Sequence, residues 1–227
     1  MKLLAKICYV AQKIRHNGLV KSWKSIIDEL TRSQPSQIGV KDAFDQEHGV
    51  DTSGQIPLYN LTVESPNAVF GIKYQPSSSG SFKAAIKVLP IQPEECCFVD
   101  LGAGKGRVLL FASAYPFKRL IGVEFARELV EIARRNLRSC DRAEIVYADA
   151  AEYDFPDEDL VVYMYNPFGK PVMEKVISRL SKAAESKPER RVYVIYHDPR
   201  ELEIIQKFGV EVARLPGTAI YQINPRI

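Results

Sequence analysis

Phe98-Val99-Asp100-Leu101-Gly102-Ala103-Gly104-Lys105-Gly106-Arg107 is the stretch that decides the fold of this chain. An apolar run ends in an acid, three alternate glycines follow, and a helical pattern begins after them. A second apolar run, Ile121-Gly122-Val123-Glu124, ends in a glutamate about twenty residues after the glycines. This order of strand, glycine-rich turn, helix and acid-terminated strand predicts a βαβ unit that holds a nucleoside-bearing cofactor.

The spacing of the glycines distinguishes between cofactors. A dinucleotide fingerprint requires Gly-x-Gly-x-x-Gly, which would place the third glycine at Arg107. That fingerprint also brings a pyrophosphate to the helix N-terminus, where Asp100 would repel it. An acid before the glycines instead suits a cofactor that brings a cation to the turn. S-adenosylmethionine does so with its ammonium and sulfonium groups, so a nicotinamide-dependent dehydrogenase is disfavoured.

The composition agrees with a globular protein of one main domain. The chain has 227 residues, 46% of them hydrophobic and 26% charged, which suits one α/β domain with an extension. A net charge of +3 does not by itself require a nucleic-acid partner. No apolar stretch approaches the roughly twenty residues that span a bilayer. The four cysteines (Cys8, Cys96, Cys97 and Cys140) form neither a metal-binding spacing nor a disulfide framework, which favours a reduced, cytoplasmic environment and no metal site.

The chain divides into an extension over residues 1–81 and a catalytic domain over residues 82–227. Residues 2–15 and 21–30 predict basic amphipathic helices, and residues 34–81 are rich in turn residues such as Asp45 and His48-Gly49. We expect this extension to cover the cofactor cleft. After it, strand and helix patterns alternate, and the last two strands, separated by Pro216-Gly217, predict a hairpin. The expected strands are 96–101, 119–124, 143–148, 159–165, 191–197, 209–215 and 218–224, and the expected helices are 105–114, 127–138, 170–186 and 199–207.

Four ordered motifs give the chain a family resemblance from Tyr74 to its C-terminus. The glycine-rich stretch and Glu124 resemble the first two acidic motifs of class I S-adenosylmethionine-dependent methyltransferases. Asp149 resembles the acid after the third strand, and Tyr165-Asn166-Pro167-Phe168 resembles the fourth motif. The resemblance implies an α/β, Rossmann-like sheet of seven strands, mostly parallel with an antiparallel C-terminal hairpin, with helices on both faces. The fourth motif and the Tyr74-x-Pro76-Ser77 lead-in look most like seven-strand protein-lysine methyltransferases.

Each motif has a predicted task at the carboxyl ends of the strands, where ligands of open parallel sheets bind. Asp100 would hold the cofactor's ammonium, Glu124 the ribose hydroxyls and Asp149 the adenine amine, with the Ala150 amide donating to the ring. The alternatives are a helix cap at Asp100 and a plain turn at Asp149. The predicted cofactor contacts are Tyr74, Ser77, Asp100, Gly102, Ala103, Gly104, Gly106, Glu124, Asp149, Ala150 and Asn166.

The predicted catalytic residues are Asn166, Pro167 and Phe168, which follow a long apolar strand and would enter the same cleft. The Asn166 side-chain oxygen and the Pro167 carbonyl could hold the N–H groups of an amine, and Phe168 could stack on a flat substrate or pack against an alkyl stem. The alternative is an ordinary turn. Phe168 stands where amine-methylating enzymes have a second proline, and His197 is a further candidate as proton acceptor.

The sequence therefore predicts a methyltransferase that uses S-adenosylmethionine, with a protein lysine as the favoured methyl acceptor. A small-molecule amine or hydroxyl comes next. Nucleic acid is third, because no aromatic-rich basic groove accompanies the basic N-terminal segment. A non-catalytic module that binds the cofactor is the alternative outside enzymes.

Overall fold

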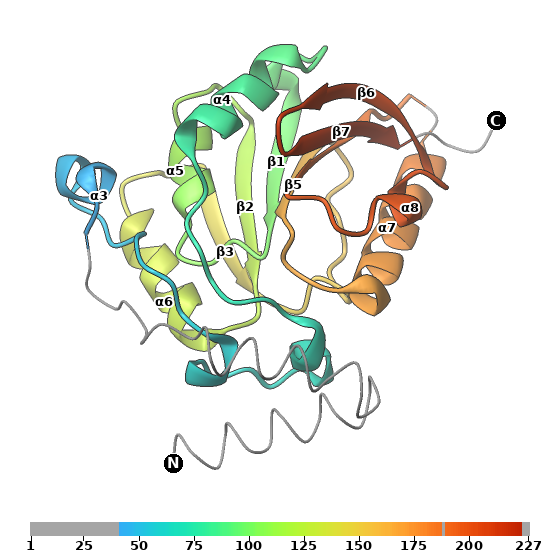
Figure 1. Cartoon of the computed structure of the whole chain (residues 1–227). Coiled ribbons are helices and arrows are strands. Elements are labelled where there is room, and N and C mark those ends of the chain that lie inside the picture. Colours follow the sequence, from blue (N-terminus) through green and yellow to red (C-terminus); the bar gives the residue numbers. More distant parts are fainter. Residues whose placement is uncertain (1–40, 188, 224–227) are drawn as a thin grey trace.

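The computed structural model describes residues 41–187 and 189–223, and its centre is a seven-stranded sheet in the order β3-β2-β1-β4-β5-β7-β6 (Figure 1). Strands β1 to β5 run parallel, whereas β7 is antiparallel to both β5 and β6. The predicted fold class is therefore confirmed, including the C-terminal hairpin. The strands are β1 (Cys96–Leu101), β2 (Arg119–Glu124), β3 (Ala143–Tyr147), β4 (Asp159–Tyr165), β5 (Val192–His197), β6 (Gly209–Leu215) and β7 (Thr218–Ile223).

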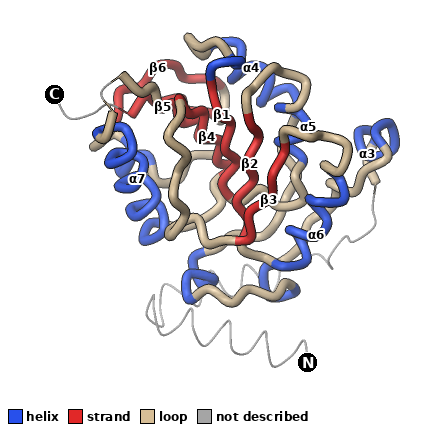
Figure 2. The backbone as a smooth tube through the Cα atoms, turned by 180° about the vertical axis from the view of Figure 1, so that it is seen from behind, coloured by secondary structure: helices blue, strands red, loops and turns tan. Residues whose placement is uncertain are grey.

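Helices cover both faces of the sheet. Figures 1 and 2 show α4, α5 and α6 on one side and α7 and α8 on the other. The two layers correspond to two separate apolar cores, one packed by α4 to α6 and one packed by α7 and α8. The helices are α4 (Ser79–Val88), α5 (Arg107–Ala112), α6 (Arg127–Asn136), α7 (Lys170–Glu185) and α8 (Leu202–Ile205).

The central strand shows why the sheet is buried on both faces. In β1, Cys97, Val99 and Leu101 belong to the core under α7, whereas Cys96 and Phe98 belong to the core under α5. Successive strand residues point to opposite faces, so a continuous apolar run serves both layers. Burying an aromatic side chain such as Phe98 contributes about 1.5–3 kcal/mol. Such runs fix the strand boundaries closely enough for the sequence to predict them.

The segment before the domain contains a short helix that the sequence analysis did not predict. Asp45 and His48 were expected in turns, but they lie in α3 (Ala43–His48). The Asp42 side chain accepts the Asp45 N–H as an N-cap, and Gly49, with φ 65°, ends the helix. The predicted turn is therefore wrong over these residues, because the Asp42 side chain satisfies a backbone N–H of the first turn, which has no partner within the helix.

Residues 62–72, which we call the strap, run across the carboxyl ends of the strands (Figure 1, teal, at the bottom of the view). Val63 pairs with Ala126 just after β2, and Gly71 pairs with Phe168 just after β4. Within the strap lies the short helix η2 (Pro66–Phe70), and it is preceded by η1 (Leu58–Asn60).

Several predictions concern parts at the ends of the chain. The two basic amphipathic helices predicted before residue 31 lie outside the described residues. The helix predicted over 199–207 is confined to α8, because Gly209 already begins strand β6. Among the residues that the structure describes, no helix has the length and apolar character needed to cross a membrane.

Candidate functional site

Two adjoining cavities lie at the carboxyl ends of the parallel strands. The larger has a volume of about 700 Å³ and the smaller about 340 Å³, and both are lined by Gly102, Phe125 and Pro167. We call the larger the cleft and the smaller the slot. Besides the shared residues, the cleft is bordered by Tyr74, Ser77, Asp100, Ala103, Gly104, Glu124, Tyr163, Tyr165 and Asn166 among others, and the slot by Asn67, Asp149, Ala150 and Phe168 among others.

Asp100 is a buried acid at the wall of the cleft. It is 3% exposed, and its side chain makes no hydrogen bond or ion pair with any described residue. Burial, together with the nearby charge of Glu124, raises the pKa of Asp100 well above its usual range. A buried carboxylate without a partner is costly, so this position favours a ligand that brings a cation. A helix-cap role has no hydrogen bond to support it here.

Glu124 is the second buried acid of the cleft, at the end of β2. One of its oxygens, Oε2, accepts the Gly104 N–H at 2.8 Å, and Oε1 accepts those of Phe125 at 2.9 Å and Ala126 at 2.8 Å. Burial raises the pKa of Glu124, and the three backbone donors oppose that rise. The carboxylate therefore also braces the glycine turn, and its remaining lone pairs border the cleft.

The glycine turn needs its glycines for two different reasons. Gly104 has φ +57°, and a Cβ there would lie 2.4 Å from the Tyr74 ring, so the tyrosine packs directly on bare backbone. Gly106, with φ +81°, faces Leu137 after α6 and does not line either cavity. The predicted cofactor contact at Gly106 is therefore revised to a packing role, whereas Gly102, Ala103 and Gly104 line the cleft.

Asp149 lies at the end of the slot and already has partners. Its Oδ2 accepts a hydrogen bond from the Ser65 hydroxyl and one from Asn67 Nδ2 at 2.8 Å, while Oδ1 accepts the Ala151 N–H at 2.8 Å. The Ala150 N–H has no hydrogen-bond partner among the described residues. A carboxylate beside a free backbone donor suits the amine edge of adenine, as the sequence predicts.

The Asn166-Pro167-Phe168 turn connects the two cavities, but its three residues differ in availability. Asn166 has φ 39°, an uncommon backbone conformation for a residue other than glycine, and its side-chain amide makes no hydrogen bond with the described residues. The Pro167 carbonyl accepts the Ile72 N–H at 3.2 Å. Phe168 is 6% exposed and belongs to the apolar core. Asn166 is therefore the group of the three with unused hydrogen-bonding capacity.

The comparisons with known proteins agree with this geometry. Residues 98–187 match the family described as a methyltransferase domain. The chain carries a methyltransferase domain. Its cofactor is S-adenosylmethionine. No curated protein gives a significant match to the sequence.

Several solved structures are similar in fold to this methyltransferase. A putative methyltransferase yhhF from Escherichia coli is 18% identical with a TM-score of 0.54, over 76% of this chain and 100% of that one. An RNA methyltransferase from Salinibacter ruber, in complex with S-adenosyl-L-homocysteine, is 22% identical with a TM-score of 0.50, over 67% and 95%. A predicted N6-adenine-specific DNA methylase from Listeria monocytogenes is 19% identical with a TM-score of 0.51, over 65% and 51%. At these identities the likeness shows the fold.

The residues of the methyltransferase fit its cofactor. The Asp100 carboxylate, which has no hydrogen-bond or ion-pair partner among the described residues, suits a cationic methionyl group, and Gly102, Ala103 and Gly104 line the cleft beside it. Glu124 borders the cleft between this end and the slot, where Asp149 and Ala150 present one acceptor and one donor. No group of three metal-ligating side chains occurs among the described residues.

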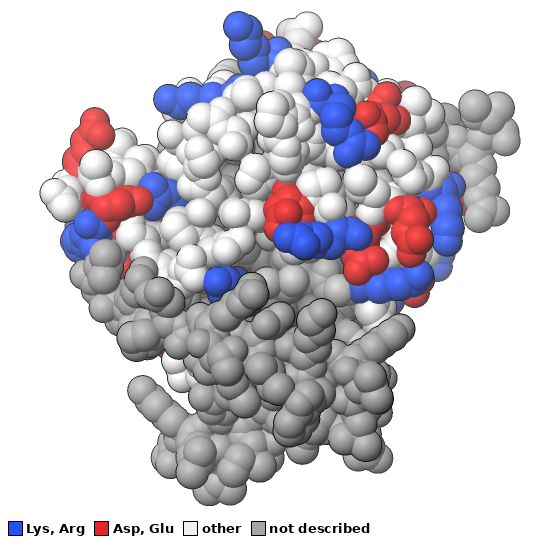
Figure 3. All heavy atoms as spheres, in the orientation of Figure 1, with Lys and Arg blue, Asp and Glu red and all other residues white. Residues whose placement is uncertain are grey.

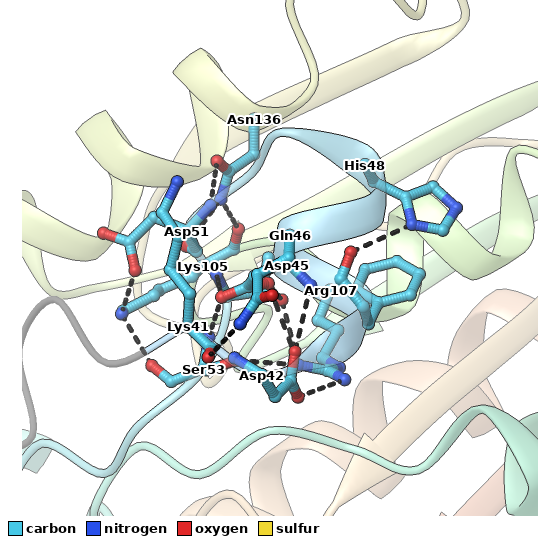
Figure 4. A network of polar contacts seen from close by, with 12 residues as sticks. Lys41, Asp42, Asp45, Gln46, His48, Asp51, Ser53, Lys105, Arg107 and Asn136 are labelled. Atoms are coloured by element: carbon cyan, nitrogen blue, oxygen red, sulfur yellow. Dashed lines mark hydrogen bonds and ion pairs between the residues drawn. The ribbon is translucent and has the colours of Figure 1, made fainter.

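A polar network behind the glycine turn escaped the sequence analysis (Figure 4). Lys105 is fully buried, with Nζ 2.7 Å from Asp51 Oδ1 and 2.8 Å from the Ser53 carbonyl. Arg107 pairs with Asp42 at 2.7 Å, and its Nε is buried without a partner. The sequence shows that Lys105 and Arg107 stand beside three glycines. It does not show their partners, because these lie more than fifty residues earlier in the chain.

Ser77 and His197 are the remaining candidates from the sequence. The Tyr163 hydroxyl donates to Ser77 Oγ at 3.4 Å, and burial raises the pKa of Tyr163. His197 contacts the cleft only through Tyr165, whose ring lies edge-on at 4.5 Å between centroids, while His197 Nδ1 pairs with Thr218 Oγ1 at 2.7 Å. Burial lowers the pKa of His197. A neutral histidine that does not line the cleft fits a structural role better than proton transfer.

Proposed function

We propose that this methyltransferase transfers a methyl group to an amine, with a protein lysine as its acceptor. The observation that carries the proposal is the side-chain amide of Asn166, which makes no hydrogen bond with the described residues and lies in the same cleft as Asp100. A neutral amine attacks with its lone pair, so its N–H groups must be oriented with the lone pair facing the methyl group, and an amide oxygen is a neutral acceptor for an N–H. Asp100 and Asn166 thus supply complementary groups, one for the cofactor cation and one for the acceptor.

The chemistry needs positioning more than acid–base catalysis. The bound cofactor supplies an electrophilic methyl group: a new C–N bond forms, the C–S bond breaks, its electron pair stays on sulfur, and the amine proton leaves to solvent. The Asn166 oxygen orients the acceptor nitrogen, and its positive φ fixes the direction of the side chain. Tyr163 and Tyr165 line the cleft and exclude water from the reacting groups.

The side chains around the acceptor favour a slender group. Pro76, Ser77 and Tyr165 border the cleft on the Asn166 side, and Tyr165 is partly buried. An alkyl stem with a terminal amine can pack between such rings while its nitrogen meets Asn166. This argument supports lysine over a flat base, because Phe168 is committed to the core and offers no free face in the cleft.

An amino group of a nucleobase is the second candidate acceptor. It is supported by the likeness to an RNA methyltransferase and to a predicted N6-adenine-specific DNA methylase, and by the basic sequence between Lys2 and Ile27. Against it, in the part of the face in Figure 3 that is not grey, Lys and Arg side chains are scattered, several beside Asp or Glu, and form no continuous basic surface. Ion pairs such as Arg119–Glu158 and Lys170–Glu203 also join surface cations to acids.

The test is to incubate the full chain with methyl-labelled S-adenosylmethionine and a fractionated cell extract. Label in protein that survives nuclease and alkaline treatment, and that appears as methyl-lysine after hydrolysis, supports the proposal. Label only in nucleic acid supports the second candidate, and label only in small molecules contradicts both. The Asp100→Asn variant is the control for enzyme-independent labelling.

A further inference from the structure

The slot has the composition of a site for a flat heterocycle with one polar end. Its walls are largely apolar, with Val123, Phe125 and Phe168 among them, and its polar side chains are Asp149 and Asn67. Apolar walls with a few convergent polar groups are typical of a ligand pocket. Of the two side chains, Asp149 belongs to the methyltransferase domain, whereas Asn67 comes from the strap.

The orientation of the Asn67 amide follows from its partner. Asp149 Oδ2 accepts hydrogen bonds from Nδ2 of Asn67 at 2.8 Å and from the Ser65 hydroxyl. The amide nitrogen is therefore fixed toward Asp149, and the amide oxygen Oδ1 has no hydrogen-bond partner among the described residues. The backbone is fixed too, because the Asn67 N–H donates to Ser65 Oγ at 3.0 Å in the N-cap of η2.

The slot thus presents two oxygen acceptors side by side and one nearby donor, the Ala150 N–H. An exocyclic amine of a purine has two N–H donors, and a carboxylate oxygen of Asp149 can accept only one of them in a given geometry. A purine with a carbonyl in that position would instead direct an oxygen at both acceptors, and a site built for donors rejects such a group strongly.

We propose that Asn67 reads the adenine of the cofactor together with Asp149, its Oδ1 accepting the second N–H of the amine. The strap is then a binding element of the methyltransferase, and it selects adenine over hypoxanthine. The same contact ties cofactor binding to the acceptor side, since the strap also holds the Pro167 carbonyl through the Ile72 N–H. The inference concerns the cofactor alone and is independent of the methyl acceptor.

The test measures binding by calorimetry, with S-adenosylhomocysteine and its hypoxanthine analogue S-inosylhomocysteine as probes and the full chain as protein. We expect Asn67→Ala to weaken S-adenosylhomocysteine by about 3- to 10-fold, as for one neutral hydrogen bond. It should weaken the binding of the inosine analogue less, so that the ratio of the affinity for S-adenosylhomocysteine to the affinity for S-inosylhomocysteine falls. Glu64→Ala is the matched control, because Glu64 is an exposed strap residue that pairs with Arg127 and does not touch Asp149.

The Ser65→Ala variant distinguishes direct recognition of adenine by Asn67 from a structural role in holding the strap against Asp149. Ser65 donates to Asp149 and accepts the Asn67 N–H, but its loss leaves the Asn67 side-chain oxygen in place, so Ser65→Ala should lower the ratio of the two affinities less than Asn67→Ala does. If Asn67→Ala weakens the binding of both probes equally, Asn67 only tethers the strap and the proposal is overturned. Wild-type protein that binds neither probe would overturn the cofactor assignment itself, and near-ultraviolet circular dichroism of each variant shows whether it is folded.

Discussion

Replacing Asp100 by asparagine should separate the stability of the free protein from its affinity for the cofactor. Asp100 is 3% exposed and Glu124 is 4% exposed, and neither carboxylate has an ion-pair partner in the part of the chain that the structure describes. Glu124 accepts three backbone N–H groups, whereas Asp100 accepts none. The charge on Asp100 is therefore the less stable of the two, in agreement with its strongly raised pKa.

The sign of the stability change follows from this pKa. An acid whose pKa is raised by folding binds its proton more tightly in the folded state than in the unfolded state. The free energy of unfolding therefore falls as pH rises from about 3.9, the ordinary pKa of an aspartate, toward the raised value. Asp100→Asn removes that fall. The cofactor-free variant should be at least as stable as the wild type in mildly alkaline buffer.

The same substitution should weaken cofactor binding. It removes a hydrogen bond between a cation and a carboxylate, worth about 1.5–3 kcal/mol, or about 10- to 150-fold in the dissociation constant. Because a bound cation favours ionised Asp100, wild-type binding releases a proton. Its affinity should rise with pH, by up to about tenfold per unit below the raised pKa. The variant should lose this part of the pH dependence.

Calorimetry with S-adenosylhomocysteine across a series of pH values, together with thermal unfolding of the free proteins, tests both effects. Asp154→Asn is the matched control, because its side chain is 94% exposed and lies in a surface ion pair with Arg179. If Asp100→Asn binds as tightly as the wild type with the same pH dependence, Asp100 does not hold the cofactor cation, and the reasoning is refuted.

Substitutions at Asn166, Lys105 and Gly104 test other parts of the site. Asn166→Ala and Asn166→Gly should each lower turnover by about 100-fold or more, with the affinity for S-adenosylhomocysteine changed only a few fold. Glycine tolerates the φ of 39°. Full activity in the glycine variant alone would therefore mean that the backbone conformation matters and the side chain does not. Lys105→Met should lower the free energy of unfolding by about 2–4 kcal/mol in denaturant titrations, because Asp51 and the Ser53 carbonyl lose their buried cation. The surface variant Lys170→Met should change it by less than about 0.5 kcal/mol, and equal effects would contradict the buried role. Gly104→Ala should lower both stability and cofactor affinity, since its Cβ would meet the Tyr74 ring at 2.4 Å; unchanged calorimetric affinity would contradict that close packing.

The sequence predicts the sheet well because its signals are local. Continuous apolar runs ending in Asp100, Glu124 and Tyr165 give strands whose ends differ from the structure by little or nothing. The same runs bring the acids to one edge of a parallel sheet, so their placement around one cleft could be expected. Gly106 shows the limit of this reasoning: three alternate glycines look alike in sequence, yet Leu137, far along the chain, decides which of them packs against a helix.

Contacts made over long separations could not be predicted. Nothing in the local sequence indicates that Lys105 is buried, yet it is fully buried and pairs with Asp51 and the Ser53 carbonyl. Asp45 reads as a turn residue, but it is fully buried and accepts from Thr52 Oγ1 at 2.5 Å and from the Ser53 N–H at 2.8 Å. Each of these charges is stable inside the protein only because a remote partner neutralises or solvates it, and no local pattern identifies that partner.

These remote partners all come from the segment that precedes the methyltransferase domain. Its Asp51 and Ser53 hold Lys105 beside the glycine turn, its Tyr74 packs on Gly104, and its strap contacts Asp149. The Asp100 end and the Asp149 end of the proposed cofactor site are therefore each completed by residues of this segment. Hydrogen bonds to buried groups are lost together when their common support is removed, so the segment and the cofactor should stabilise each other. Binding of S-adenosylhomocysteine should then protect the amides of the strap from hydrogen exchange, even though most strap residues, such as Val63, do not line either cavity.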